Sequence, residues 1–167
     1  MARSKASKAK AGGVSAKRLE IVRIFDASRV RVFEMWSTPA HLQMWSAPKG
    51  FTIPDARMDF REGGSWYTHM RSPGGEDHRV QGKYLEIVDG ARIVMTHAWL
   101  DERGQPGPET RVTVTFEDCA EETYPKTKMT FLQEGFTSKA SRDGHAGGWN
   151  ECFDLLEAYL ASVAKSP

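Results

Sequence analysis

The chain has 167 residues, a formal net charge of +1 and 40% hydrophobic residues, with five tryptophans and eight phenylalanines. This composition is typical of one globular domain with a sizeable core. No apolar run approaches the roughly 20 residues that a membrane span needs. The two cysteines, Cys119 and Cys152, fall in no pattern with metal-binding spacing, and a reducing compartment would leave both as free thiols. We expect no metal and no other cofactor.

The basic residues are unevenly distributed. Residues 1–18 hold six Lys or Arg and no acid, whereas the remainder has 17 basic against 22 acidic residues, a charge of about −5. The first segment is rich in Ala, Ser, Gly and Lys, which predicts a disordered basic tail before a single domain at 19–164. It has no apolar secretory core, so we expect a cytoplasmic protein. The acidic body argues against a nucleic-acid partner.

The front of the domain is expected to hold one strand and two short helices. Residues 19–25 alternate in the manner of a strand. A helix follows with Asp26 or Ser28 as its N-cap, and Thr38-Pro39 predicts the start of a second helix. The residues of these helices that should face the core are Val30, Phe33, Trp36, Leu42 and Trp45.

Between residues 51 and 134, short alternating runs are separated by turn residues, which indicates an antiparallel meander. Asp89-Gly90 is the strongest hairpin signal among these turns. The strands are expected near 51–60, 64–72, 78–88, 92–100, 110–117 and 126–134.

A long amphipathic helix is expected at the end of the chain. The sequence leaves two possible start positions for this helix. Ser138 is a suitable N-cap, but Gly144, Gly147 and Gly148 would then lie inside the helix, each at a cost of about 1 kcal/mol relative to alanine. The helix could instead begin at Trp149. The apolar stripe, at intervals of three and four residues, is Trp149, Cys152, Phe153, Leu156, Leu160 and Val163.

These elements make an α+β layout. A curved antiparallel sheet of about six or seven strands, wrapped around the long helix, would bury the helix stripe and the inner strand faces together. Such a sheet seldom closes completely on the helix. The gap would be an apolar pocket.

Four segments carry a family resemblance: SRVRVFEMWSTPAHLQMWSAPKGFT, DFREGGSWYTHMRSPGG, GKYLEIVDGARIVMTHAW and GGWNECFDLLEAYL. In order and spacing they resemble the SRPBCC superfamily, which has the helix-grip fold of START lipid-transfer domains and the birch pollen allergen. Within it, about residues 19–164 resemble the branch homologous to the activator of heat-shock protein 90 ATPase. The chain departs from many relatives at Ser46 and Ala47, where they have a second tryptophan and a glycine.

The resemblance implies a cavity between sheet and helix, and strand parity indicates which side chains face it. His97 is the best candidate for proton transfer, because an ordinary imidazole titrates near pH 6.5, and Tyr84 could supply a hydroxyl nearby. A lone inward histidine is more often a core residue, and the remaining histidines lack metal-site spacing. The expected ligand-binding residues are Trp36, Trp45, Trp66, Thr68, Met70, Met95, His97, Trp99, Phe116, Met129, Phe131, Trp149 and Phe153.

We therefore expect the domain to bind a small, largely apolar molecule. Common nucleophile-elbow and phosphate-loop motifs are absent, but this absence says little in a superfamily whose relatives use a shared cavity for unrelated purposes. The apolar, aromatic-rich inward set with few charges is what favours a binding protein over an enzyme. One alternative is a cyclase, dehydratase or hydrolase that uses His97 and Tyr84 in the same cavity. Another, implied by the resemblance alone, is a stress-related activator of the heat-shock protein 90 ATPase. The chain lacks the separate N-terminal domain of better-known eukaryotic activators, so we expect no chaperone partner. An exposed sheet edge would permit a homodimer.

Overall fold

The computed structural model describes residues 17–119 and 123–164. Its seven strands form one antiparallel sheet in the order β1-β7-β6-β5-β4-β3-β2. The strands are β1 (Arg18–Phe25), β2 (Thr52–Met58), β3 (Ser65–Arg71), β4 (Asp77–Val88), β5 (Arg92–Leu100), β6 (Thr110–Asp118) and β7 (Thr127–Glu134). The helices are α2 (Arg29–Ser37), α3 (Pro39–Leu42) and α4 (Lys139–Ala164).

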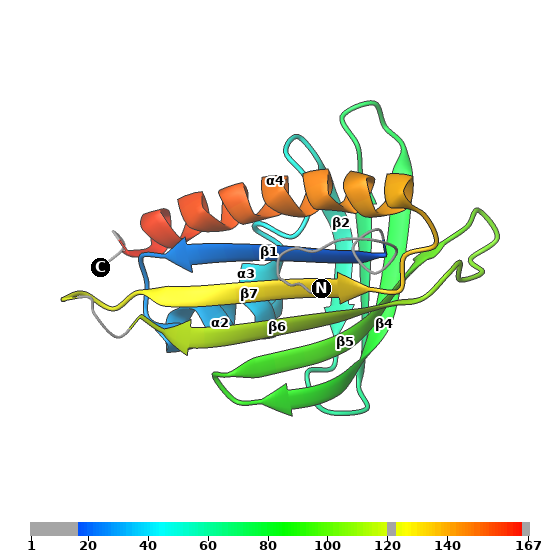
Figure 1. Cartoon of the computed structure of the whole chain (residues 1–167). Coiled ribbons are helices and arrows are strands. Elements are labelled where there is room, and N and C mark those ends of the chain that lie inside the picture. Colours follow the sequence, from blue (N-terminus) through cyan, green and yellow to red (C-terminus); the bar gives the residue numbers. More distant parts are fainter. Residues whose placement is uncertain (1–16, 120–122, 165–167) are drawn as a thin grey trace.

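The sheet is strongly curved, as Figure 1 shows. Strands β1 and β7 run along α4, whereas β2 and β4 run across its direction. The concave face therefore wraps around α4, and the short helices α2 and α3 lie at one end of the concavity. This arrangement confirms the predicted α+β class with a sheet gripping the last helix. The predicted basic tail lies almost entirely outside the described residues, and Arg18, its last residue, already belongs to β1.

The strand predictions agree with the structure to within two residues at each end. The predicted hairpin at Asp89-Gly90 is confirmed: Gly90 has φ +72°, and the Ala91 N–H donates to the Val88 carbonyl at 2.9 Å. Pro54 lies in β2, which pairs only with β3 and so is an edge strand, where proline removes no ladder hydrogen bond.

A bulge in β4 changes which side chains of that strand face inward. Tyr84 pairs with Met95, but Glu86 pairs with Val94, so one extra residue is inserted at Leu85. Tyr84 is buried and Leu85 is 47% exposed. Strand β5 has no such irregularity in its pairing with β6.

The first helix is capped by Ser28 and not by Asp26, because the Ser28 hydroxyl accepts a hydrogen bond from the Arg31 N–H at 3.2 Å. Val30 was predicted to face the core, but it does not. It is 64% exposed, because the buried face of α2 is instead made by Val32, Phe33, Met35 and Trp36. Thr38 precedes α3, although its side chain makes no capping hydrogen bond.

The long helix begins at the earlier of the two predicted positions. The Ser141 N–H donates to the Ser138 hydroxyl at 3.1 Å, as an N-cap requires. Gly144, Gly147 and Gly148 consequently lie inside α4. Among the described residues, no helix is both long and apolar enough to cross a membrane.

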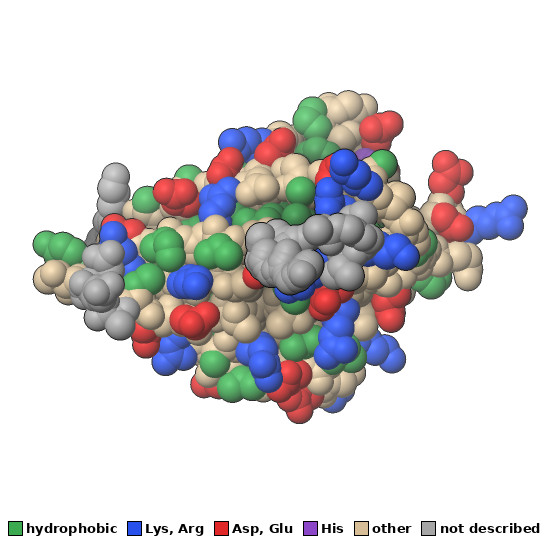
Figure 2. All heavy atoms as spheres, viewed as in Figure 1, with side chains coloured by type: hydrophobic (Ala, Val, Ile, Leu, Met, Phe, Trp, Pro, Cys, Tyr) green, Lys and Arg blue, Asp and Glu red, His purple; other side chains and the backbone are tan. Residues whose placement is uncertain are grey.

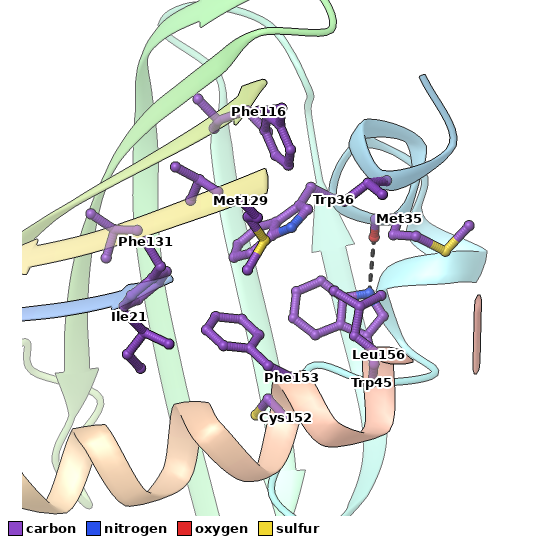
Figure 3. Packing of buried hydrophobic residues seen from close by; sticks show 14 of the residues in the cluster. Ile21, Met35, Trp36, Trp45, Phe116, Met129, Phe131, Cys152, Phe153 and Leu156 are labelled. Carbon is purple, nitrogen blue, oxygen red and sulfur yellow. Dashed lines mark hydrogen bonds between the residues drawn. The ribbon is translucent and has the colours of Figure 1, made fainter. Parts of the chain in front are cut away.

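The core is an aromatic cluster between α4, α2 and strands β6 and β7 (Figure 3). Phe131 and Phe153 contact edge to face, with ring centroids 5.3 Å apart, and Trp36 lies within 6.4 Å of both. On the face shown in Figure 2, basic and acidic side chains are interspersed. Arg23 joins the sheet edge to α4 through ion pairs with Asp154 at 2.8 Å and Glu157 at 3.9 Å. Hydrogen bonds from Arg23 and Lys49 lower the pKa of Asp154.

Candidate functional site

A cavity of about 460 Å³ lies between the concave sheet and the first half of α4. Its volume falls within the range of about 300–1,000 Å³ that is usual for small-molecule sites. All five tryptophans of the chain line it: Trp36, Trp45, Trp66, Trp99 and Trp149. Ala140, Gly144 and Pro48 contribute to the wall where α4 begins. The walls are thus mainly apolar, with many aromatic rings.

Four of the five indole N–H groups have partners within the protein, which holds each ring in one orientation. The donors and acceptors are Trp45 to Met35 O at 3.1 Å (Figure 3), Trp66 to Thr96 O at 3.2 Å, Trp99 to His145 Nε2 at 3.0 Å and Trp149 to Gln133 Oε1 at 2.9 Å. The Trp36 Nε1 atom is buried and has no partner among the described residues, and the same holds for the Ser46 hydroxyl.

Gly82 is what allows Trp66 to lie flat against the sheet wall. Trp66 and Gly82 are opposite each other in the β3–β4 ladder. A Cβ at Gly82 would come within 1.8 Å of the Thr96 carbonyl oxygen and 2.5 Å of Trp66 Nε1. Only glycine leaves room for the indole N–H to pass over β4 and reach that carbonyl.

A buried polar chain fixes Trp149 at the other side of the cavity. Gln133, which is fully buried on β7, accepts from the Trp149 indole and donates through Nε2 to the Thr110 hydroxyl at 2.8 Å. Thr110 in turn donates to the His97 carbonyl at 3.2 Å. Elements α4, β7, β6 and β5 are therefore linked through side chains as well as through packing.

His145 closes one end of the cavity. Its Nε2 accepts from the Trp99 indole, which can only donate, and its Nδ1 lies 2.7 Å from the Ser141 carbonyl, which can only accept. These two bonds fit the neutral ring with its proton on Nδ1. Beyond His145, Trp99 and His97 lies a second space of about 80 Å³, for which the three side chains also form a wall.

Burial strongly shifts the pKa values of the candidate acid–base groups. Burial, reinforced by the neighbouring His145, lowers the pKa of His97 to about 3. Burial raises the pKa of the Tyr84 phenol, and burial together with Glu151 raises the pKa of the Cys152 thiol to about 12. All three groups are therefore uncharged near neutral pH. No hydrogen bond joins His97 to Tyr84 in the described part of the chain.

Nine of the thirteen residues predicted for the site line the cavity: Trp36, Trp45, Trp66, Thr68, Met70, Met95, His97, Trp99 and Trp149. The other four do not: Phe116, Met129, Phe131 and Phe153. Their predicted inward orientation is right, since each is at most 3% exposed. They lie where α2 and α4 close directly on β6 and β7, however, so they fill core instead of facing space (Figure 3).

Sequence reasoning missed two polar residues at the site. His145 was considered only as a metal ligand, yet it lies one helical turn before Trp149 and shares its face of α4. Gln133 continues the inward alternation of Met129 and Phe131, so strand parity could have identified it. Among residues 17–119 and 123–164, no group of three or more His, Cys, Asp or Glu could hold a metal ion.

The fold and this cavity define a helix-grip protein. The chain belongs to the family described as "Activator of Hsp90 ATPase homolog 1-like protein", whose sequence pattern matches residues 26–161. A search of curated proteins found no match.

Solved structures of bacterial proteins have the same fold. The AHSA1 protein of Silicibacter pomeroyi is 23% identical, with a TM-score of 0.79 over 86% of this chain and 97% of that one. A protein from Arthrobacter aurescens is 26% identical, with a TM-score of 0.77 over 91% and 90% of the two chains. One from Rhizobium leguminosarum is 28% identical, with a TM-score of 0.69 over 87% and 94%.

Proposed function

We propose that the protein binds a small, largely apolar molecule in the cavity between the sheet and α4. The observation that carries this proposal is the lining, in which all five tryptophans of the chain surround about 460 Å³ of space. The fold commonly binds hydrophobic ligands, which also supports the proposal. Apolar side chains of a cavity wall gain dispersion contacts when a ligand packs against them.

The tryptophan rings are suited to hold such a molecule without rearrangement. Four are oriented by hydrogen bonds to the protein, so little side-chain freedom is lost when a ligand binds. Trp36 and Trp149 stack with their ring centroids 6.2 Å apart. A planar or compact ring system would contact several of these faces at once.

The test uses N-phenyl-1-naphthylamine, an uncharged fluorescent probe whose emission rises in apolar surroundings. We expect a saturable increase in emission at one site per chain, together with quenching of tryptophan emission by energy transfer. At about 100 times the dissociation constant, binding linkage contributes about 2.7 kcal/mol to stability, which raises the melting temperature by roughly 5–10 °C. An unsaturable signal with an unchanged melting temperature would refute the proposal.

The alternatives of an enzyme and of a chaperone activator receive less support. The enzyme alternative needs an acid–base pair, whereas burial holds His97 and Tyr84 uncharged and no hydrogen bond joins them among the described residues. The family description names a chaperone activator. Adding the protein to purified Hsp90 should leave the rate of ATP hydrolysis unchanged, and a severalfold increase would favour the chaperone alternative.

A further inference from the structure

Three deeply buried hydrogen-bonding side chains of the sheet wall make no hydrogen bond to another residue in the described part of the chain. They are Thr68 on β3, Tyr84 on β4 and His97 on β5, and all three line the cavity. His78 on the same wall makes none either, but it is only half-buried. The exposed fractions of Thr68, Tyr84 and His97 are 5%, 3% and 5%. Their polar atoms are not among the fully buried atoms that lack a partner. The small surface that they keep is therefore surface of the cavity.

The three side chains are grouped around Gly82. On β4, Gly82 is one inward position from Tyr84. The register of β4 with β5 places His97 across from Gly82, and the register with β3 places Thr68 diagonally to it. The Trp66 indole lies over Gly82, so it occupies the space between these three side chains. We call Thr68, Tyr84 and His97 the polar strip.

The remainder of the lining disfavours an anionic ligand. Among the described residues, none of the lining side chains is a Lys, Arg, Asp or Glu. His97 is uncharged because burial lowers its pKa to about 3, and both ring nitrogens of His145 are already engaged. The N-terminus of α4, near the wall formed by Ala140, would favour an anion only about twofold to fivefold. An unpaired buried carboxylate loses more than about a hundredfold in affinity through desolvation.

From these observations we propose that the ligand is a ring compound that carries no anionic group and bears a hydroxyl or carbonyl group, and that the polar strip binds this group while the tryptophans enclose the apolar body. This inference rests on the proposed function and specifies its ligand class. A hydroxyl can both donate and accept a hydrogen bond, so it can pair with any one of the Tyr84 phenol, the Thr68 hydroxyl and a His97 ring nitrogen. A wholly apolar ligand would leave the strip unsatisfied, at a cost in affinity.

The test measures displacement of N-phenyl-1-naphthylamine by three competitors of one shape at about pH 8: 1-methylnaphthalene, 1-naphthalenemethanol and 1-naphthoate. The naphthoate should compete at least about a hundredfold more weakly than the alcohol. In Thr68→Val, Tyr84→Phe and His97→Phe, the affinity for the alcohol should fall about threefold to tenfold while that for 1-methylnaphthalene is unchanged. Tyr67→Phe is the matched control, because Tyr67 is next to Thr68 on β3 and does not line the cavity.

The outcomes separate the two proposals. If the probe binds but naphthoate competes as well as the alcohol, or if the strip variants weaken both uncharged competitors equally, the ligand class is wrong and the binding function stands. If the probe does not bind, the proposed function fails and the ligand class fails with it. Thr68→Val and Tyr84→Phe nearly preserve side-chain shape, so the test does not depend on the folding of His97→Phe.

Discussion

Replacing Gly148 with leucine tests whether the glycines of α4 keep the cavity open. Gly148 lies inside the helix and lines the cavity, and a Cβ there would meet nothing nearer than Cγ of Pro48 at 3.9 Å. Leucine therefore fits locally and gains about 0.8 kcal/mol of helix propensity over glycine. Its side chain would occupy space that a ligand needs. We expect the variant to be more stable and yet defective in binding.

The helix propensity and the lost space set the expected changes in melting temperature and in affinity for the probe. For a domain of 150–250 residues, about 0.8 kcal/mol raises the melting temperature by roughly 2–3 °C. The affinity for N-phenyl-1-naphthylamine should fall at least about tenfold, which corresponds to about 1.4 kcal/mol. The assay is a fluorescence titration with a thermal melt of the same sample.

Gly147→Leu is the matched control for this experiment. Gly147 is the adjacent residue of α4, but it is exposed, does not line the cavity and has nothing within 4 Å of an added Cβ. This variant should gain the same stability and bind the probe as wild type does. Equal binding by the two leucine variants would refute the role assigned to Gly148.

Three further predictions concern the groups that surround the cavity. The pKa of His97 is about 3 in the folded protein and near 6.5 in the unfolded chain. Its contribution to stability is therefore complete above about pH 6.5 and is lost below it at up to about 1.4 kcal/mol per pH unit. Urea titrations at about pH 7, 5 and 4 should show a shallower loss of unfolding free energy for His97→Phe than for wild type, and parallel losses would contradict this. Gln133→Leu leaves the part-buried Trp149 N–H without its acceptor and should cost about 1–3 kcal/mol of unfolding free energy in the same assay. An unchanged midpoint would show that the bond is dispensable. Gly82→Ala should cost about 3 kcal/mol or more because its Cβ meets backbone at 1.8 Å, and a stably folded variant would mean that β4 and β5 can separate locally.

Local patterns in the sequence were enough to predict the elements and their order. Alternation and turn residues located every strand to within two residues at each end, because a half-buried strand has a side-chain period of two. Ser138 and Ser28 were available as caps, but the pattern alone left an alternative open for each. The choice depended on packing, since α4 tolerates its glycines only because the stripe from Trp149 onward is held by the sheet.

Parity also identified which side chains face inward, but not which of them face open space. Phe131 and Trp149 are both inward, and their ring centroids are 4.5 Å apart, yet only Trp149 lines the cavity. The difference arises from how far α4 stands from each strand, and that distance depends on the curvature of the whole sheet. A bulge such as the one at Leu85 has no clear local signal, although it changes the orientation of every later residue of its strand.

The sequence by itself determined the strands, the α+β layout and the aromatic character of the inner face, because all three depend on periodicity and composition within each segment. The helix-grip fold was implied by the family resemblance. Only the tertiary structure decided that five tryptophans surround one cavity and that four of their N–H groups are already paired. It alone also brought Thr68, Tyr84 and His97, which come from three different strands, to the wall of one cavity. Such a group is defined by strand register and sheet curvature, which are properties of the whole sheet and not of any one segment.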